Sequence, residues 1–149
     1  MNNTKHMKLP FLNLVHVGIV VYNMKKTITK LEAFQIGPAK SLSLPPSERD
    51  FLFRGKVLCS RQDVFVVPCG SIDLELFEPL EGDSPWSEFL EKKGEGIHHF
   101  AYSSDDIERD MSVVSSLGIS VIHNGKWEGG GFAYLDLGAS NIIIEIIQL

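Results

Sequence analysis

Two histidines of this 149-residue chain occupy matching places in an internal repeat. His16 lies in a β-branched apolar run and is followed seven residues later by Asn23, a residue type that begins helices. His99 opens a second apolar run and is followed seven residues later by Asp106, which suits the same helix-capping position. Imidazole nitrogens bind divalent transition metals. The repeat therefore presents the same type of metal ligand twice, from equivalent predicted strands.

Two glutamates repeat in the same way. Glu75 lies in the last predicted strand of the first copy, and Glu145 lies in the last predicted strand of the second. Isoleucines surround Glu145 on both faces of its strand, where an unpaired carboxylate would be costly, so a positive partner is expected. Because strand side chains alternate between faces, the histidines and glutamates can share one face. They form a nitrogen and oxygen ligand set suited to Zn, Ni, Co or Mn, and we predict a divalent metal site at His16, Glu75, His99 and Glu145.

Each of these residues also has a simpler explanation. A single strand histidine such as His16 is often only a hydrogen-bonded group of the core, and Glu75, two residues after Asp73, could belong to a solvated face. Adjacent strand residues point to opposite faces, so only one of His98 and His99 should reach the site. The repeat favours His99 and leaves His98 with a supporting or structural role. The coincidence of all four positions is what favours the metal site.

Both copies are predicted to consist of a strand, a helix and three further strands, which gives an α+β fold of two βαβββ modules. In the first copy, strands are expected at 14–22, 51–59, 63–69 and 72–80. In the second copy, strands are expected at 97–103, 119–123, 131–137 and 141–148. The expected helices are 24–34, 84–93 and 105–118. The domain organisation is then a loose tail (1–12) and one domain (13–149), made of module one (about 14–80), a linker helix (about 84–93) and module two (about 97–149).

The composition limits the partners of the protein. The net charge is −5, the isoelectric point is about 5.5, and the 14 Lys and Arg residues are scattered, so no basic face for a nucleic acid is expected. The apolar run near the N-terminus is too short to span a bilayer. We therefore expect a cytoplasmic protein that acts on a small molecule, without a nucleic acid or membrane partner.

The segment from 72 to 108 resembles a known family. It contains an E-L-x-x-P-L strand end, the triplet D-S-P, an F-L-E-K-x-G helix end and the motif G-x-G-I-H-H. Together with the two βαβββ modules, these motifs resemble the vicinal oxygen chelate superfamily (glyoxalase, bleomycin resistance protein and extradiol dioxygenase fold), and most of all its methylmalonyl-CoA epimerase branch. The resemblance covers about residues 14–148 and implies a mixed, curved sheet around a central site. It also implies metal positions at His16, Glu75, His99 and Glu145.

The resemblance implies proton abstraction next to a thioester carbonyl, assisted by a divalent metal. Glu145 is the first candidate for a group that binds metal and transfers protons, and Glu75 or Asp63 could act on the opposite face of the substrate. The segment that should hold the second proton-transfer carboxylate in the epimerases does not match here, and Asp63 is only a nearby candidate. The substrate implied is an acyl-CoA or another thioester, and a homodimer is expected.

Two other functions fit the same fold. Epimerases often carry Gln at the position of Glu75, whereas glyoxalase I carries Glu, so this residue favours a lactoylglutathione lyase while the paired histidines favour an epimerase. A metal-free binding or resistance protein is the third possibility. Such relatives normally lose several ligands, and this chain retains all four.

Overall fold

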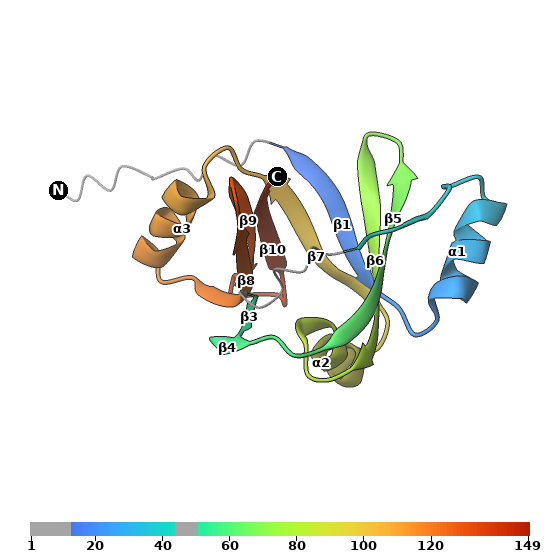
Figure 1. The fold of residues 1–149 in the computed structure, drawn as a ribbon, viewed down its shortest axis with the longest axis horizontal. Helices are drawn as coiled ribbons and strands as arrows, with labels where there is room; N and C mark the ends of the chain where they lie inside the picture. Colours follow the sequence, from blue (N-terminus) through green and yellow to red (C-terminus); the bar gives the residue numbers. More distant parts are fainter. Residues whose placement is uncertain (1–12, 44–50) are drawn as a thin grey trace.

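The computed structural model describes residues 13–43 and 51–149, so the predicted tail (1–12) lies outside the described residues. These residues form one curved ten-stranded sheet, and two of the three helices pack on its outside (Figure 1). The strands are β1 (Leu14–Val20), β2 (Lys40–Ser41), β3 (Leu52–Phe53), β4 (Lys56–Val57), β5 (Arg61–Cys69), β6 (Ile72–Glu81), β7 (Gly96–Ser103), β8 (Ser120–Trp127), β9 (Gly130–Asp136) and β10 (Ile143–Gln148). The helices are α1 (Met24–Ala33), α2 (Pro85–Lys93) and α3 (Ile107–Ser116).

The strand order shows the two predicted modules side by side. The order is β2-β5-β6-β1 followed by β7-β10-β9-β8, and the antiparallel pair β1 and β7 joins the modules in the middle of the sheet. In each module the first strand runs parallel to the last, as β1 with β6 and β7 with β10. The other pairs within the modules are antiparallel, so the sheet is mixed. The predicted fold class is confirmed.

The pairing register shows that the two modules correspond residue by residue at the predicted ligands. In module one, Gly18 pairs with Glu75. In module two, Ala101 pairs with Glu145. Gly18 and Ala101 each lie two residues after a predicted ligand histidine, so each module presents its histidine and its glutamate in the same relative position on neighbouring parallel strands.

Side-chain caps fix the helices that follow the first strands. The carboxamide of Asn23 accepts a hydrogen bond from the backbone N–H of Lys26, and the carboxylate of Asp106 accepts one from the backbone N–H of Arg109. Ser84 and Ser87 form a reciprocal cap at the start of α2. These are the starting points that the sequence predicts. With nine or ten residues each, the helices of the described part of the chain are too short to cross a bilayer.

Because side chains alternate along each strand, the curved sheet has an inner face and an outer face, and the outer face of each module packs against one helix. On the outer faces, Leu76 packs with residues of α1, and Ile146 packs with residues of α3. These two helices lie at opposite ends of the molecule (Figure 1). The inner face carries the largest apolar cluster, whose buried members are Val20, Phe51, Val64, Phe77, Trp86, Ile122, Phe132 and Tyr134. This aromatic inner face surrounds the predicted site.

The strand predicted at 51–59 is wrong. That segment forms the small hairpin β3–β4, and β3 pairs with β8 at the far edge of module two (Leu52 with Asn124). The position expected for it in module one is taken by the short strand β2, which pairs with β5. Phe51, next to the hairpin, is 3% exposed and packs edge to face on Phe132 of module two. Burial of this aromatic ring against the other module explains why the segment leaves its own.

Candidate metal centre

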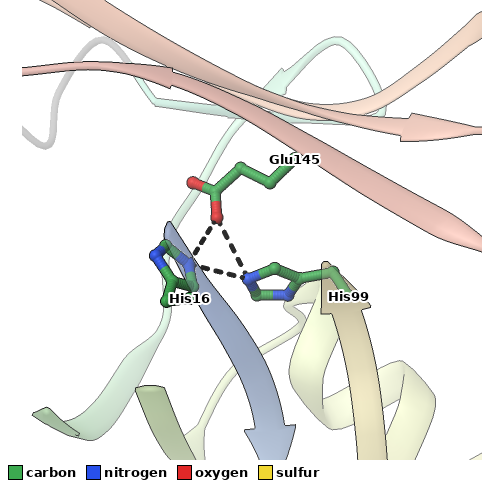
Figure 2. Close-up of side chains that lie close together, drawn as sticks. All are labelled: His16, His99 and Glu145. Atoms are coloured by element: carbon green, nitrogen blue, oxygen red, sulfur yellow. Dashed lines mark hydrogen bonds and ion pairs between the residues drawn. The ribbon is translucent and has the colours of Figure 1, made fainter. Parts of the chain in front are cut away.

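Three of the four predicted ligands converge on one point (Figure 2). Glu145 Oε2 lies 2.8 Å from His16 Nε2 and 3.0 Å from His99 Nε2. The two Nε2 atoms are 3.3 Å apart. His16 comes from β1 in module one, whereas His99 and Glu145 come from β7 and β10 in module two. The centre is therefore built across the junction between the modules.

The spacing of these three atoms suits a transition-metal ion. Ligand atoms about 2.1 Å from a common ion, at tetrahedral or octahedral angles, lie about 3.0–3.4 Å from one another. The observed separations of 2.8–3.3 Å are close to this range. All three side chains are buried, and together they are the one group of at least three potential ligands with such spacing in residues 13–43 and 51–149. Two imidazoles and a carboxylate suit Zn, Ni, Co or Mn, and they leave coordination positions for a substrate.

The charges in this cluster oppose the effect of burial. Burial alone would raise the pKa of Glu145, but hydrogen bonds from His16 and His99 bring it down to about 2, so the carboxylate is ionised. Burial lowers the pKa of His16, but the hydrogen bond to Glu145 and the charges of the nearby carboxylates outweigh it, and the net pKa is raised. Burial lowers the pKa of His99. The anionic Glu145 thus lies against His16, whose positive form it favours, and this agrees with the partner that its apolar strand predicts.

Glu75 lies beside this cluster rather than inside it. Its Oε2 is 3.5 Å from His16 Nε2, and it does not belong to the tight group of three. Its side chain is 18% exposed, compared with 6% for Glu145. Burial and the charges of Glu145 and Asp73 outweigh the attraction of His16 and raise the pKa of Glu75 to about 7. Glu75 is thus placed either to complete a metal site or to exchange a proton with a molecule beside it.

The raised pKa of Glu75 predicts a pH-dependent stability of the metal-free protein. A glutamate whose pKa is about 7 in the folded chain and 4.5 in its unperturbed form loses stability as the pH rises through that interval. Glu75→Gln should therefore be more stable than the parent near pH 8, by on the order of 3 kcal/mol, and show little of this gain near pH 5. Urea unfolding in the presence of a chelator measures both values. Glu78→Gln is the control on the same strand, and a gain independent of pH would contradict the prediction.

His98 also faces inward, contrary to the alternation argument. Gly18 pairs with His99 and the next residue of β1, Ile19, pairs with Ile97, so His98 is an extra residue in β7 and forms a β-bulge. The bulge turns both imidazoles to the same side, and His98 Nδ1 lies 3.0 Å from His99 Nδ1. Burial, together with the neighbouring His99, lowers the pKa of His98 to about 3. A neutral His98 can accept the Nδ1 hydrogen of His99, which leaves His99 Nε2 free for a metal.

Asp63 does not reach the centre. It pairs with Glu78 in the β5–β6 ladder, and its neighbour Phe65, two residues along, packs with the cluster under α1. Asp63 therefore lies on the outer face of the sheet, and it is exposed. Because Val66 of the same strand lines the inner cavity, the alternation of β5 excludes Asp63 from it. The prediction that Asp63 acts on the substrate is therefore wrong, because its side chain lies on the outer face of the sheet.

A cavity of about 450 Å³ opens beside the metal-ligand cluster, and we call it the central cavity. Its wall is largely aromatic and aliphatic, with carboxylates at one part of it. It is lined by Val15, His16, Leu42, Ser43, Phe51, Val66, Asp73, Glu75, Phe77, Trp86, His123, Trp127, Phe132, Tyr134, Glu145, Ile147 and Leu149. A mainly apolar pocket with a few convergent polar groups is typical of a small-molecule site.

Trp86, His123 and Tyr134 are among the polar side chains of this wall that were not predicted as site residues. His123 donates its Nδ1 hydrogen to the carbonyl oxygen of Leu52, and burial lowers the pKa of His123 to about 4. The side-chain alternation of the predicted strand 131–137 could have placed Tyr134 on the inner face. In the structure Tyr134 pairs with Glu145, whose side chain also faces inward. Trp86 is carried by a helix outside both modules, so no strand pattern could have placed it in the cavity.

Comparisons with known proteins identify the family of the chain. The profile of the Glyoxalase/Bleomycin resistance protein/Dioxygenase superfamily matches residues 15–134. The chain is 33% identical over 139 residues to "Uncharacterized protein YqjC" of Bacillus subtilis (strain 168), with 91% of each chain covered.

Solved structures share the fold, and the following two are among them. Hypothetical protein BH1468 from Bacillus halodurans C-125 has a TM-score of 0.69 at 25% identity, covering 92% of this chain and 94% of that one. Methylmalonyl-CoA epimerase from Mycobacterium tuberculosis has a TM-score of 0.69 at 19% identity, covering 95% of this chain and 90% of that one. With the sequence match over most of its length, the chain belongs to the Glyoxalase/Bleomycin resistance protein/Dioxygenase superfamily.

Proposed function

We propose that the protein is a metal-dependent epimerase or isomerase that moves a proton next to a thioester carbonyl. The observation that carries this proposal is the convergence of His16, His99 and Glu145. Of these, His16 and Glu145 line the central cavity, and Glu75 lines it beside them. The fold is also that of methylmalonyl-CoA epimerases. One of these, from Streptomyces coelicolor, is known in complex with 2-nitronate-propionyl-CoA, which makes an acyl-CoA the first substrate class to test.

His16, His99 and Glu145 are the residues that would hold a divalent cation. When bound, such an ion supplies positive charge that polarises a substrate carbonyl and stabilises the negative charge that develops when the neighbouring carbon loses a proton. Glu145 Oε2 is already engaged by both histidines, and its side chain is 6% exposed. We therefore assign Glu145 to metal binding, and proton transfer to another group.

Glu75 is the group we assign to proton transfer. Its carboxylate borders the central cavity, is more exposed than that of Glu145, and has a 3.5 Å contact to only one histidine of the cluster. A carboxylate with this freedom can approach a substrate carbon and remove its proton. An epimerase that uses a single base must return the proton to the opposite face of the same carbon after the substrate or the base moves. An isomerase can instead deliver the proton on the same face to a different atom of the substrate.

Proton exchange with solvent tests this function. The metal-loaded protein, incubated with methylmalonyl-CoA in deuterated water, should incorporate deuterium at the carbon next to the thioester, as read by mass spectrometry. Glu75→Gln should lower the exchange rate by about 100-fold or more. Glu78→Gln, on the outer face of the same strand, should leave the rate unchanged. Equal rates in the two variants would contradict the role of Glu75.

A lactoylglutathione lyase is the second candidate, because glutamate stands at position 75. The same exchange experiment with the hemithioacetal of methylglyoxal and glutathione separates the two reactions. Exchange with this compound and not with methylmalonyl-CoA would favour the lyase. A metal-free binding protein would show neither exchange nor stoichiometric metal after purification. That the protein is cytoplasmic and forms a homodimer remains a prediction, which sedimentation and fractionation can test.

A further inference from the structure

A second pocket, of about 240 Å³, lies beside α2. We call it the α2 pocket, and no described residue lines both this pocket and the central cavity. Its wall also contains His98, whose ring contacts the predicted ligand His99. A molecule bound in the α2 pocket would therefore lie one side chain away from the metal-ligand cluster. The charged residues of its wall are Arg54, Glu88, Lys92, Lys93 and Asp136.

His98 presents one unpaired ring nitrogen to the α2 pocket. Its Nδ1 is engaged by His99 Nδ1, at 3.0 Å. Its Nε2 has no hydrogen-bond partner among the described residues, and it is not one of the fully buried polar atoms of that part of the chain. The residue as a whole is only 5% exposed. Because buried polar groups usually have a partner, a ligand atom is expected opposite His98 Nε2.

A metal ion determines whether this nitrogen accepts or donates. Without a metal, His99 Nε2 donates its hydrogen to Glu145 Oε2, 3.0 Å away, so His99 Nδ1 accepts from His98 Nδ1 and His98 Nε2 is an acceptor. A metal at His99 Nε2 requires the hydrogen of that ring to be on Nδ1. His98 Nδ1 then accepts it, and the hydrogen of His98 is on Nε2. Each ring carries one hydrogen in both states, so metal binding converts His98 Nε2 from an acceptor into a donor.

The two carboxylates in the wall of the α2 pocket are already engaged. Glu88 is paired with both Arg54, at 2.8 Å, and Lys92, at 2.7 Å. Asp136 accepts a hydrogen bond from the backbone N–H of Gly138. Three cationic side chains and two anionic ones line the pocket, which leaves an excess of one positive charge.

Lys93 carries this excess charge. In residues 13–43 and 51–149 it forms no ion pair, and its ammonium group lies over the ring of Phe89, 5.8 Å from the centroid. Besides burial, the positive charge of Lys93 lowers the pKa of His98, so the two side chains are close. An unpaired ammonium group beside an accessible ring nitrogen favours an anionic ligand that accepts hydrogen bonds.

We propose that the α2 pocket binds a small oxyanion, such as a carboxylate or a phosphate-like group, between His98 Nε2 and the ammonium of Lys93, and that metal binding strengthens it. The metal-bound form supplies the N–H donor at His98. An oxygen that accepts this hydrogen also makes His98 Nδ1 a better acceptor, which supports His99 as a metal ligand. The oxyanion and the metal therefore raise each other's affinity by the same factor. This inference rests on the metal centre of the proposed function.

Nuclear magnetic resonance tests the proposal, with sulfate and acetate as probes. The ¹⁵N-labelled protein is titrated with each probe at constant ionic strength, once zinc-loaded and once zinc-free. Backbone amide signals of Lys93 and Asn141 report on the α2 pocket. We expect saturable shifts of both signals, and binding that is about fivefold tighter or more in the zinc-loaded protein. Zinc affinity, measured by titration calorimetry, should rise by the same factor in saturating sulfate.

Two substitutions with opposite effects separate this pocket from anion binding at the zinc ion itself. Lys93→Gln should weaken the binding of both probes about threefold to fivefold. Glu88→Gln frees two cations and should strengthen it by a similar factor. Lys30→Gln in the last turn of α1, and Glu91→Gln in α2 but outside the pocket, change the charge equally and should leave binding unchanged.

The results that overturn the inference differ from those that overturn the proposed function. The inference fails if neither probe moves the two signals, or if Lys93→Gln and Lys30→Gln weaken binding equally. It also fails if zinc binds and leaves the affinity for both probes unchanged, a result that does not affect the proposed function. A protein that binds no zinc would contradict both.

Discussion

His99→Ala is expected to abolish stoichiometric metal binding. His99 is completely buried, and its Nε2 lies 3.0 Å from Glu145 Oε2, so its loss removes one of three converging ligands. Loss of a group that merely supports a ligand already weakens metal affinity about 10–100-fold, so loss of a ligand should exceed about 100-fold. Metal content after dialysis against zinc, measured by mass spectrometry, and titration calorimetry give the two values.

The matched control for this variant is His123→Ala. His123 is 1% exposed and belongs to the same aromatic inner face, but it lies outside the ligand cluster. Both substitutions remove a buried imidazole, and each should lower the free energy of unfolding by about 2–4 kcal/mol. Only His99→Ala should lose the metal. Equal metal content in the two purified variants would contradict the assignment of His99 as a ligand.

Gly18→Ala should also remove the metal, although it changes no ligand. The Cβ atom of an alanine at this position would overlap the ring of His99, which lies directly over the glycine. Since β1 and β7 are paired at these residues, neither backbone can move away easily, and the ring must leave its position. We expect metal affinity to fall by at least about tenfold to 100-fold, the range found when a ligand is misaligned.

Gly125→Ala separates this effect from general destabilisation. Its added Cβ would overlap Phe51 and Phe132 instead, away from the ligand cluster. Thermal unfolding should show that both variants are less stable than the parent. Titration calorimetry with zinc should show weakened binding only for Gly18→Ala. Weakened zinc binding of similar size in both variants would show that the loss reflects stability rather than the position of His99.

The parts of the fold that sequence predicts well are those decided by local patterns. Asn23 and Asp106 cap helices because a side-chain oxygen can satisfy a free backbone N–H nearby, which requires no knowledge of the rest of the fold. Strand alternation places Leu76 and Ile146 toward the helices and Glu145 toward the inside. The repeat then suffices to bring His16, His99 and Glu145 together.

The features that sequence misses depend on distant partners. The bulge at His98 is decided by how β7 pairs with β1, so alternation within β7 alone gave the wrong face for one histidine. The hairpin β3–β4 leaves its own module because Phe51 finds an aromatic surface in the other. Non-local pairing thus decided both of these errors. Asp63 is a different case, because it was named only as lying near the segment expected to hold the second proton-transfer carboxylate, and the alternation of β5 directs it outward.

The β3–β4 hairpin, which pairs with β8 through β3, also connects the two modules. In the described chain β8 has β9 on one side and β3 on the other, so residues of the first half protect an edge of the second. A fragment that began at β7 would expose that edge and lack Phe51 in its aromatic cluster. The two modules therefore depend on each other for stability, and the chain should unfold in one cooperative step.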